Sequence, residues 1–192
     1  GLRYGSISSP EKFYFSWKED VDDNSRLMLD KYLIKMCSKE RIIELLNDFV
    51  LYDGGIKKLP RVHQYLAVKE AQKYVNRYEG GIIWHTQGSG KSLTMVYLAK
   101  WILENNPKAR IAIVTDRDEL DKQIEGVFTD AGETIFRTKS GRDLMGKLGQ
   151  HTPRLLCSLV HKFGKKDVAN FEKYIQELKD NPVQVSGELF VF

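Results

Sequence analysis

A glycine-rich stretch at residues 85–92, "HTQGSGKS", constrains the fold of this chain more than any other part of the sequence. It follows a short apolar run, "GIIW" at residues 81–84, and leads into helix-forming residues from Ser92 to Glu104. Glycines permit a tight turn, and a helix that begins at such a turn directs backbone N–H groups at an anion. A strand at "GIIW", the loop and the following helix together predict a P-loop in an α/β domain.

The loop residues have separate expected roles in binding a nucleotide triphosphate. Lys91 is expected to reach the β- and γ-phosphates as the catalytic residue, and the Ser92 hydroxyl to hold Mg²⁺. His85 replaces the first glycine of the usual pattern, and we interpret it as a strand-end residue that shapes the loop; a catalytic base is the alternative. The predicted ATP-binding residues of the loop are Thr86, Gln87, Gly88, Ser89, Gly90, Lys91, Ser92 and Leu93.

Short apolar runs alternate with helix-like runs after Pro60. The patterns predict helices over 62–78, 117–128, 141–149 and 167–179, and strands over 110–115, 133–138, 154–160 and 188–192. This alternation is typical of a three-layer α/β/α P-loop (RecA-like) domain with a parallel sheet, here over residues 60–192. Trp84 and Trp101 are expected in or near its core.

Residues 1–59 have a different pattern, and we predict a linker and a mainly helical lead-in to the second domain. Apolar residues recur at helical spacing between Ile42 and Phe49, and Ser38 is a plausible N-cap of that helix. This segment is expected to contribute packing rather than chemistry.

The excess of positive charge is local. The net charge is +4, and residues 137–166 contain eight Lys and Arg but a single acid, Asp143. Such a stretch suits a polyanion such as a nucleic-acid backbone, although a solvated surface gives the same pattern.

Cysteine spacing and hydropathy favour a reduced, cytoplasmic protein. Cys37 and Cys157 match no metal or redox spacing, and no apolar run approaches the length of a membrane span. We therefore expect no membrane association. The first residue is Gly1 and the last run is apolar, so we expect a piece of a longer protein.

Several stretches together resemble the R subunit of type I restriction-modification enzymes, a superfamily 2 helicase-like ATPase. They are "YDGGIKKLPRVHQYLAVKEA", "WHTQGSGKS", "IAIVTDRDELDKQI" and "LVHKFGKK", and the resemblance spans roughly residues 52–192. It implies the first RecA-like lobe of an ATP-dependent DNA translocase, and for the full-length protein a type I site-specific deoxyribonuclease. Methyltransferase and specificity subunits are the implied partners, and double-stranded DNA the implied substrate.

The resemblance also implies roles for individual residues. Gln64 takes the place of a glutamine that reads the adenine edge, since an amide pairs with both a donor and an acceptor. Arg117 would contact the DNA backbone, and Lys162, Lys165 and Lys166 would lie near the DNA. The family's Asp-Glu-x-His (Walker B) box does not occur in this sequence, so we expect the isolated chain to bind ATP weakly and to hydrolyse almost none.

Other functions are compatible with the same loop. Another superfamily 2 DNA or RNA helicase would keep the fold and ATP but change the partners. A regulatory module with a structural nucleotide site would have no motor cycle. A P-loop kinase for a small molecule is disfavoured by the long basic stretch and by the lack of an arginine cluster typical of a lid.

Overall fold

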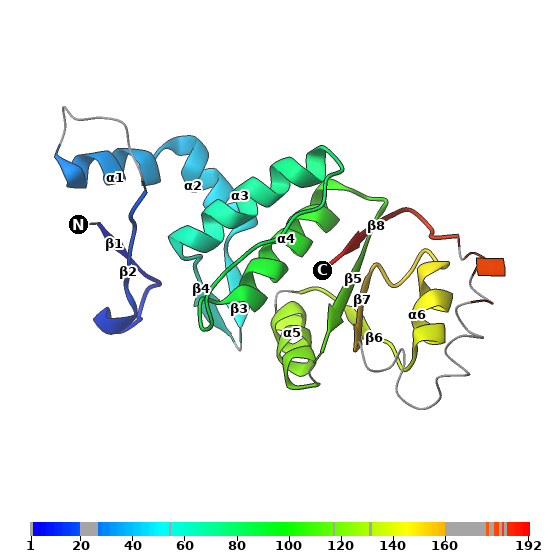
Figure 1. Cartoon of the computed structure of the whole chain (residues 1–192). Helices are drawn as coiled ribbons and strands as arrows, with labels where there is room; N and C mark the ends of the chain where they lie inside the picture. Colours follow the sequence, from blue (N-terminus) through cyan, green and yellow to red (C-terminus); the bar gives the residue numbers. More distant parts are fainter. Residues whose placement is uncertain are drawn as a thin grey trace. The chain divides into compact units, whose positions relative to one another are not determined.

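The computed structural model describes residues 2–19, 27–53, 55–116, 118–130, 132–159 and, near the C-terminus, 176, 179–180, 182 and 184–192. The chain forms two compact units, Gly1–Leu98 and Ala99–Phe192, which are described separately (Figure 1). The helix predicted over residues 167–179 lies almost entirely outside the described residues.

The first unit begins with small hairpins and short helices. Strand β1 (Arg3–Tyr4) pairs antiparallel with β2 (Phe15–Ser16), and the short 3₁₀ helix η1 (Glu11–Phe13) lies between them. Helices α1 (Met28–Met36) and α2 (Lys39–Asp48) follow, and then the hairpin of β3 (Leu51–Asp53) and β4 (Ile56–Lys58). The predicted helical lead-in is confirmed, whereas both hairpins were missed.

Two longer helices complete this part of the chain. Helix α3 (Val62–Asn76) confirms the helix predicted over 62–78, and α4 (Lys91–Asn105) confirms the helix predicted after the glycine loop. The Ser38 side chain accepts a hydrogen bond from the Arg41 N–H at 3.2 Å, so the predicted N-cap of α2 is also confirmed.

The core of the first unit is a row of aromatic rings. Trp17 lies 5.4 Å from Tyr4 and 5.6 Å from Tyr65, measured between ring centroids. Phe49 continues the row, at 4.9 Å from Tyr65 and 5.5 Å from Tyr97 of α4. All five rings are buried, and their contacts bind the N-terminal hairpin, α2, α3 and α4 into one core.

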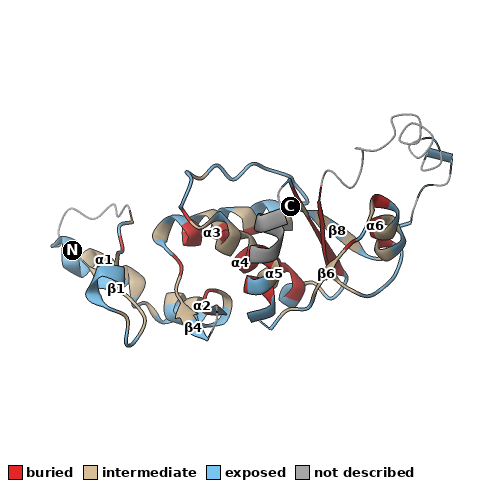
Figure 2. Cartoon of the chain, turned by 90° about the horizontal axis from the view of Figure 1, so that it is seen from below, coloured by how far each residue is buried: buried red, intermediate tan, exposed pale blue. Residues whose placement is uncertain are grey.

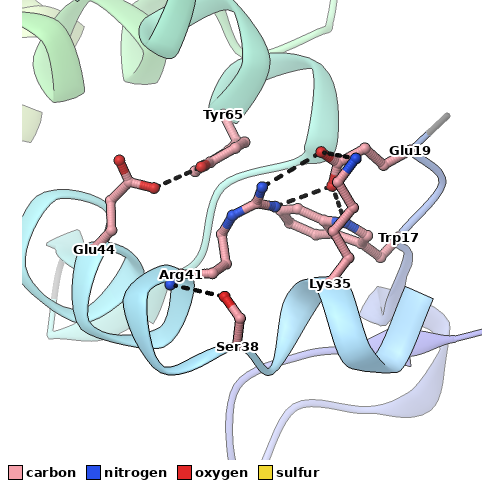
Figure 3. A network of polar contacts seen from close by, with 7 residues as sticks. All are labelled: Trp17, Glu19, Lys35, Ser38, Arg41, Glu44 and Tyr65. Atoms are coloured by element: carbon pink, nitrogen blue, oxygen red, sulfur yellow. Dashed lines mark hydrogen bonds and ion pairs between the residues drawn. The ribbon is translucent and has the colours of Figure 1, made fainter. Parts of the chain in front are cut away.

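A polar network lies beside these rings (Figure 3). Glu19 accepts hydrogen bonds from Arg41 at 3.0 and 3.4 Å and from the Trp17 indole at 3.0 Å. The Arg41 guanidinium also stacks on Tyr65 at 4.4 Å, and the Tyr65 hydroxyl donates to Glu44 at 2.5 Å. The network therefore fixes the N-terminal segment to α2 and α3 by directional bonds.

The second unit is built on a parallel sheet with the strand order β6-β7-β5-β8. Its strands are β5 (Ala109–Thr115), β6 (Ile135–Arg137), β7 (Leu155–Leu159) and β8 (Glu188–Val191). Every described pairing is parallel, as the alternating pattern predicted. The central strands β5 and β7 are almost fully buried, which explains their continuous apolar sequences.

Two helices cover this sheet. The chain passes from β5 through α5 (Asp118–Asp130) to β6, and then back through α6 (Gly141–Leu148) to β7. Because these crossovers run in opposite directions, right-handed connections place α5 and α6 on opposite faces, as Figures 1 and 2 show. Leu144 and Leu148 of α6 pack with Leu156 of β7, so the predicted α/β/α layering is present.

Two arginines bind backbone carbonyls near helix ends of the second unit. Arg110 of β5 is only 2% exposed and donates to the carbonyls of Lys147, Leu148 and Pro153 at 2.8 to 3.2 Å. Arg154 donates to the carbonyls of Leu103, Ala109 and Asn106 at 2.6 to 3.1 Å. Each guanidinium therefore ties the last turn of a helix to a neighbouring segment through backbone carbonyls.

One predicted strand is wrong. Residues 81–84 have no strand conformation, and the side chains of Ile82 and Trp84 are 90% and 88% exposed. A strand needs a neighbouring strand to pair its backbone, and none of the described strands pairs with this segment. Trp84 is therefore not a core residue, while Trp101 is half-buried as expected. Within the described residues, no helix has the length and hydropathy of a membrane span.

Candidate nucleotide-binding site

The glycine loop closes on itself before α4 begins. The Ser89 N–H and the Ser89 hydroxyl both donate to the Thr86 carbonyl, at 3.3 and 2.7 Å. Gly88 and Gly90 have φ values of +76° and +84°, which side chains with a Cβ rarely adopt. The loop therefore requires glycine at these positions for its backbone conformation.

The Gln64 side chain packs closely against Gly90. A Cβ at this position would lie 2.5 Å from Nε2 of Gln64, closer than any real contact. The Gln64 side chain is 2% exposed, its Nε2 donates to the Gly90 carbonyl at 2.8 Å, and its Oε1 accepts from the Arg61 N–H at 2.8 Å. Gln64 thus bridges the start of α3 and the end of the loop.

Two more side chains from the start of α3 contact the loop. His63 Nε2 lies 2.9 Å from the Ser89 carbonyl oxygen, and Arg61 Nη1 lies 3.5 Å from the Gly88 carbonyl oxygen. A carbonyl oxygen only accepts, so Nε2 of His63 carries the proton in this contact. Sequence reasoning missed Arg61 and His63, and their position beside Gln64 in the sequence is the only signal for them.

Lys91 and the start of α4 give the loop its positive charge. Helix α4 begins at Lys91, and its N-terminus carries a partial positive charge from the helix dipole. The Lys91 ammonium is exposed and donates to the carbonyls of Thr86 and His85 at 3.0 and 3.4 Å. A positive helix end, a lysine and a tight glycine loop are chemically suited to bind a phosphate chain.

His85 lies at the edge of this site. Its ring contacts that of His63 edge to face, with 5.1 Å between the centroids. Burial lowers the pKa of the His85 imidazole below its usual value of 6.5, and the nearby charges of His63 and Lys91 lower it further. A neutral His85 packs beside the loop, which is compatible with a shaping role; that role and the alternative of a catalytic base both stay predictions.

The structure brings the predicted nucleotide residues together. Residues 86–93 form one continuous loop and helix start, and Gln64 touches this loop. The predicted adenine contact of Gln64 stays a prediction, and here its amide already bonds to two backbone groups. Among the described residues, no cluster of three His, Cys, Asp or Glu side chains could hold a metal ion, and the Mg²⁺ role of Ser92 stays a prediction.

The predicted DNA contacts are not described by the structure. Arg117, Lys162, Lys165 and Lys166 all lie outside the described residues. Two other members of the basic stretch have structural contacts instead. Arg154 binds backbone carbonyls, and Arg137 lies 3.7 Å from the Glu125 carboxylate. Some of the basic residues in this stretch therefore form contacts that stabilise the fold.

Comparison with known proteins decides the family. The model of the SWI2/SNF2 ATPase family matches residues 63–187, which include α3, the glycine loop and the parallel sheet. The chain belongs to the SWI2/SNF2 ATPase family. This membership agrees with the RecA-like fold predicted from the sequence.

The predicted resemblance to type I restriction enzymes is also confirmed. The chain is 30% identical to a putative type I restriction enzyme MjaIXP endonuclease subunit of Methanocaldococcus jannaschii, over 97% of this chain and 21% of that protein. It is 32% identical to the type I restriction enzyme HindI endonuclease subunit of Haemophilus influenzae, over 71% of this chain and 15% of that protein. The chain thus spans about a fifth or less of the length of these relatives.

Proposed function

We propose that this chain is the ATP-binding first motor lobe of an ATP-dependent DNA translocase and endonuclease in a type I restriction system. The observation that supports it best is the loop of residues 86–90 at the start of α4, with Lys91 at the helix end. The names of the relatives supply the restriction context. We place this lobe at residues 60–192, with residues 1–59 as its lead-in.

ATP and Mg²⁺ are the proposed cofactors. Lys91 and the N–H groups at the start of α4 would neutralise the β- and γ-phosphates, and the Ser92 hydroxyl would give one oxygen ligand to Mg²⁺. Glycine at positions 88 and 90 allows the positive φ values of the loop backbone that would hold the phosphate. Gln64 would read the adenine edge through the amide valences that its backbone bonds leave free.

Double-stranded DNA is the proposed substrate, and methyltransferase and specificity subunits are the proposed partners in the cytoplasm. Arg117, Lys162, Lys165 and Lys166 would contact phosphates, which neutralises charge without reading sequence. We expect the chain to bind duplex DNA of any sequence, and the affinity to fall steeply as salt rises.

Two assays on the purified chain test this proposal. Duplex binding is measured by fluorescence anisotropy at several salt concentrations, with K162A/K165A/K166A as the variant and K69A/K73A as a matched lysine control. The triple variant should reduce the salt dependence, because fewer counterions are released. The proposal that this chain binds DNA would be contradicted if the affinity for duplex did not depend on salt concentration. It would also be contradicted if the triple variant bound the duplex as the wild type does.

Turnover is the second assay. We expect the 192-residue chain to hydrolyse almost no ATP, because the sequence has no Asp-Glu-x-His box to hold Mg²⁺ opposite Ser92. Steady phosphate release by the wild-type chain, abolished in Lys91→Ala, would contradict this expectation.

A further inference from the structure

Three consecutive carbonyls of the glycine loop face the first turn of α3. The carbonyl of Gly88 lies near Arg61, that of Ser89 near His63, and that of Gly90 near Gln64. The shortest of these contacts come from His63 and Gln64, at 2.9 and 2.8 Å. The N-terminal end of α3 therefore contacts three successive peptide groups of the loop.

This arrangement decides which way the loop N–H groups point. In a planar trans peptide, the C=O of one residue and the N–H of the next point in opposite directions. Holding the carbonyls of Ser89 and Gly90 against α3 turns the N–H groups of Gly90 and Lys91 away from α3. A phosphate bound by the loop needs those N–H groups free and preoriented.

We propose that His63 is a positioning residue of the nucleotide site, which fixes the Ser89 carbonyl so that the next N–H of the loop faces the phosphate. This inference rests on the proposed function, because it assigns a task within the same site. His63 does not touch the nucleotide itself. It acts through the Ser89–Gly90 peptide, and the edge-to-face contact with His85 fixes its ring.

The chemistry of the contact suggests a matched pair of substitutions. In Gln the side-chain amide nitrogen is as many bonds from Cα as Nε2 is in His, so His63→Gln keeps a donor in reach of the Ser89 carbonyl. In Asn the amide is one carbon shorter, so His63→Asn keeps polarity and loses the contact. His151→Asn is the control, because His151 is an exposed histidine outside the loop and lies 2.8 Å from the Ser186 hydroxyl.

The test measures binding of Mg²⁺ with mant-ATP to the 192-residue chain by fluorescence titration, and the melting of each variant by circular dichroism. We expect His63→Asn to bind about 3- to 10-fold more weakly, the effect of one lost hydrogen bond, and His63→Gln and His151→Asn to bind within about twofold of wild type. Weak binding by both His63 variants, or normal binding by His63→Asn, would overturn the inference.

Two further measurements separate this inference from the proposed function and from misfolding. Lys91→Ala should weaken binding strongly; if it does not, the proposed function fails, whatever His63 does. If Lys91→Ala is defective and His63→Asn is normal, only the His63 inference fails. The ¹⁵N spectrum of the wild-type imidazoles needs no variant: a proton on Nε2 of His63 is required, and a proton on Nδ1 alone would overturn the inference.

Discussion

At the scale of single residues, several polar side chains of this chain donate hydrogen bonds to backbone carbonyls. Gln64 and His63 satisfy carbonyls of the glycine loop, while Arg110 and Arg154 satisfy carbonyls at helix ends. A buried polar group costs free energy unless it finds a partner, so the contacts of the buried Gln64 and Arg110 contribute to the stability of the fold.

Arg110 gives a stability prediction at this scale. Arg110→Met keeps much of the side-chain volume but removes the guanidinium hydrogen bonds to the carbonyls of Lys147, Leu148 and Pro153. We expect the free energy of unfolding to fall by about 2–4 kcal/mol, because several buried acceptors lose charge-assisted bonds at once. Urea unfolding of wild type and Arg110→Met measures this difference in the free energy of unfolding. Arg77→Met is the control, since Arg77 forms an exposed ion pair with Glu79; equal stability of Arg110→Met and wild type would contradict the assignment.

At the scale of elements, periodicity predicted the helices and strands that pack on neighbours with a regular pattern. The apolar runs of β5 and β7 and the amphipathic patterns of α3, α5 and α6 all correspond to observed elements. The hairpins β1-β2 and β3-β4 were missed because their strands are only two or three residues long. The apolar run "GIIW" has the pattern of a strand, but no described strand pairs with it, and local sequence does not show whether a partner strand is present.

The candidate nucleotide-binding site was likewise predictable only in part. The loop and its helix were predictable, because glycines and Lys91 have fixed tasks at fixed spacing. The contacts of Arg61 and His63 were not predictable, because they depend on how α3 meets the loop in three dimensions. Arg154 belongs to the basic stretch that suits a polyanion, but its guanidinium binds backbone carbonyls at the end of α4.

The network around Glu19 gives a pH prediction at the element scale. Burial raises the pKa of the Glu19 carboxyl, but hydrogen bonds from Arg41 and Trp17 outweigh burial, and the pKa lies below its usual 4.5. A lowered carboxyl pKa stabilises the folded state above the unfolded pKa, and this contribution is lost as pH falls through the folded value. Glu19→Gln should therefore cost about 2 kcal/mol at pH 7 and progressively less below about pH 4.5.

Urea unfolding of wild type and Glu19→Gln at pH 7, 5, 4 and 3 measures this dependence. Glu11→Gln is the control, because Glu11 pairs with Arg3 on the exposed surface. A difference between wild type and Glu19→Gln that is independent of pH would show that the Glu19 charge does not hold the N-terminal segment to α2.

At the scale of the whole chain, different interactions stabilise the two compact units. The first unit uses an aromatic row with a polar network, and it contains the candidate nucleotide loop. The second uses a parallel sheet covered by α5 and α6. The region that matches the SWI2/SNF2 ATPase family runs from residue 63 to residue 187, so it includes parts of both units.

The central claim is that the loop before α4 binds the phosphates of ATP through Lys91. Isothermal titration of Mg²⁺-ATP into the wild-type chain and into Lys91→Ala tests it most directly, with Lys73→Ala as the control for loss of an exposed lysine. We predict one binding site, weakened at least about tenfold in Lys91→Ala and unchanged in Lys73→Ala, since a charge-assisted contact to phosphate is lost. Equal affinity of wild type and Lys91→Ala for ATP would contradict the claim.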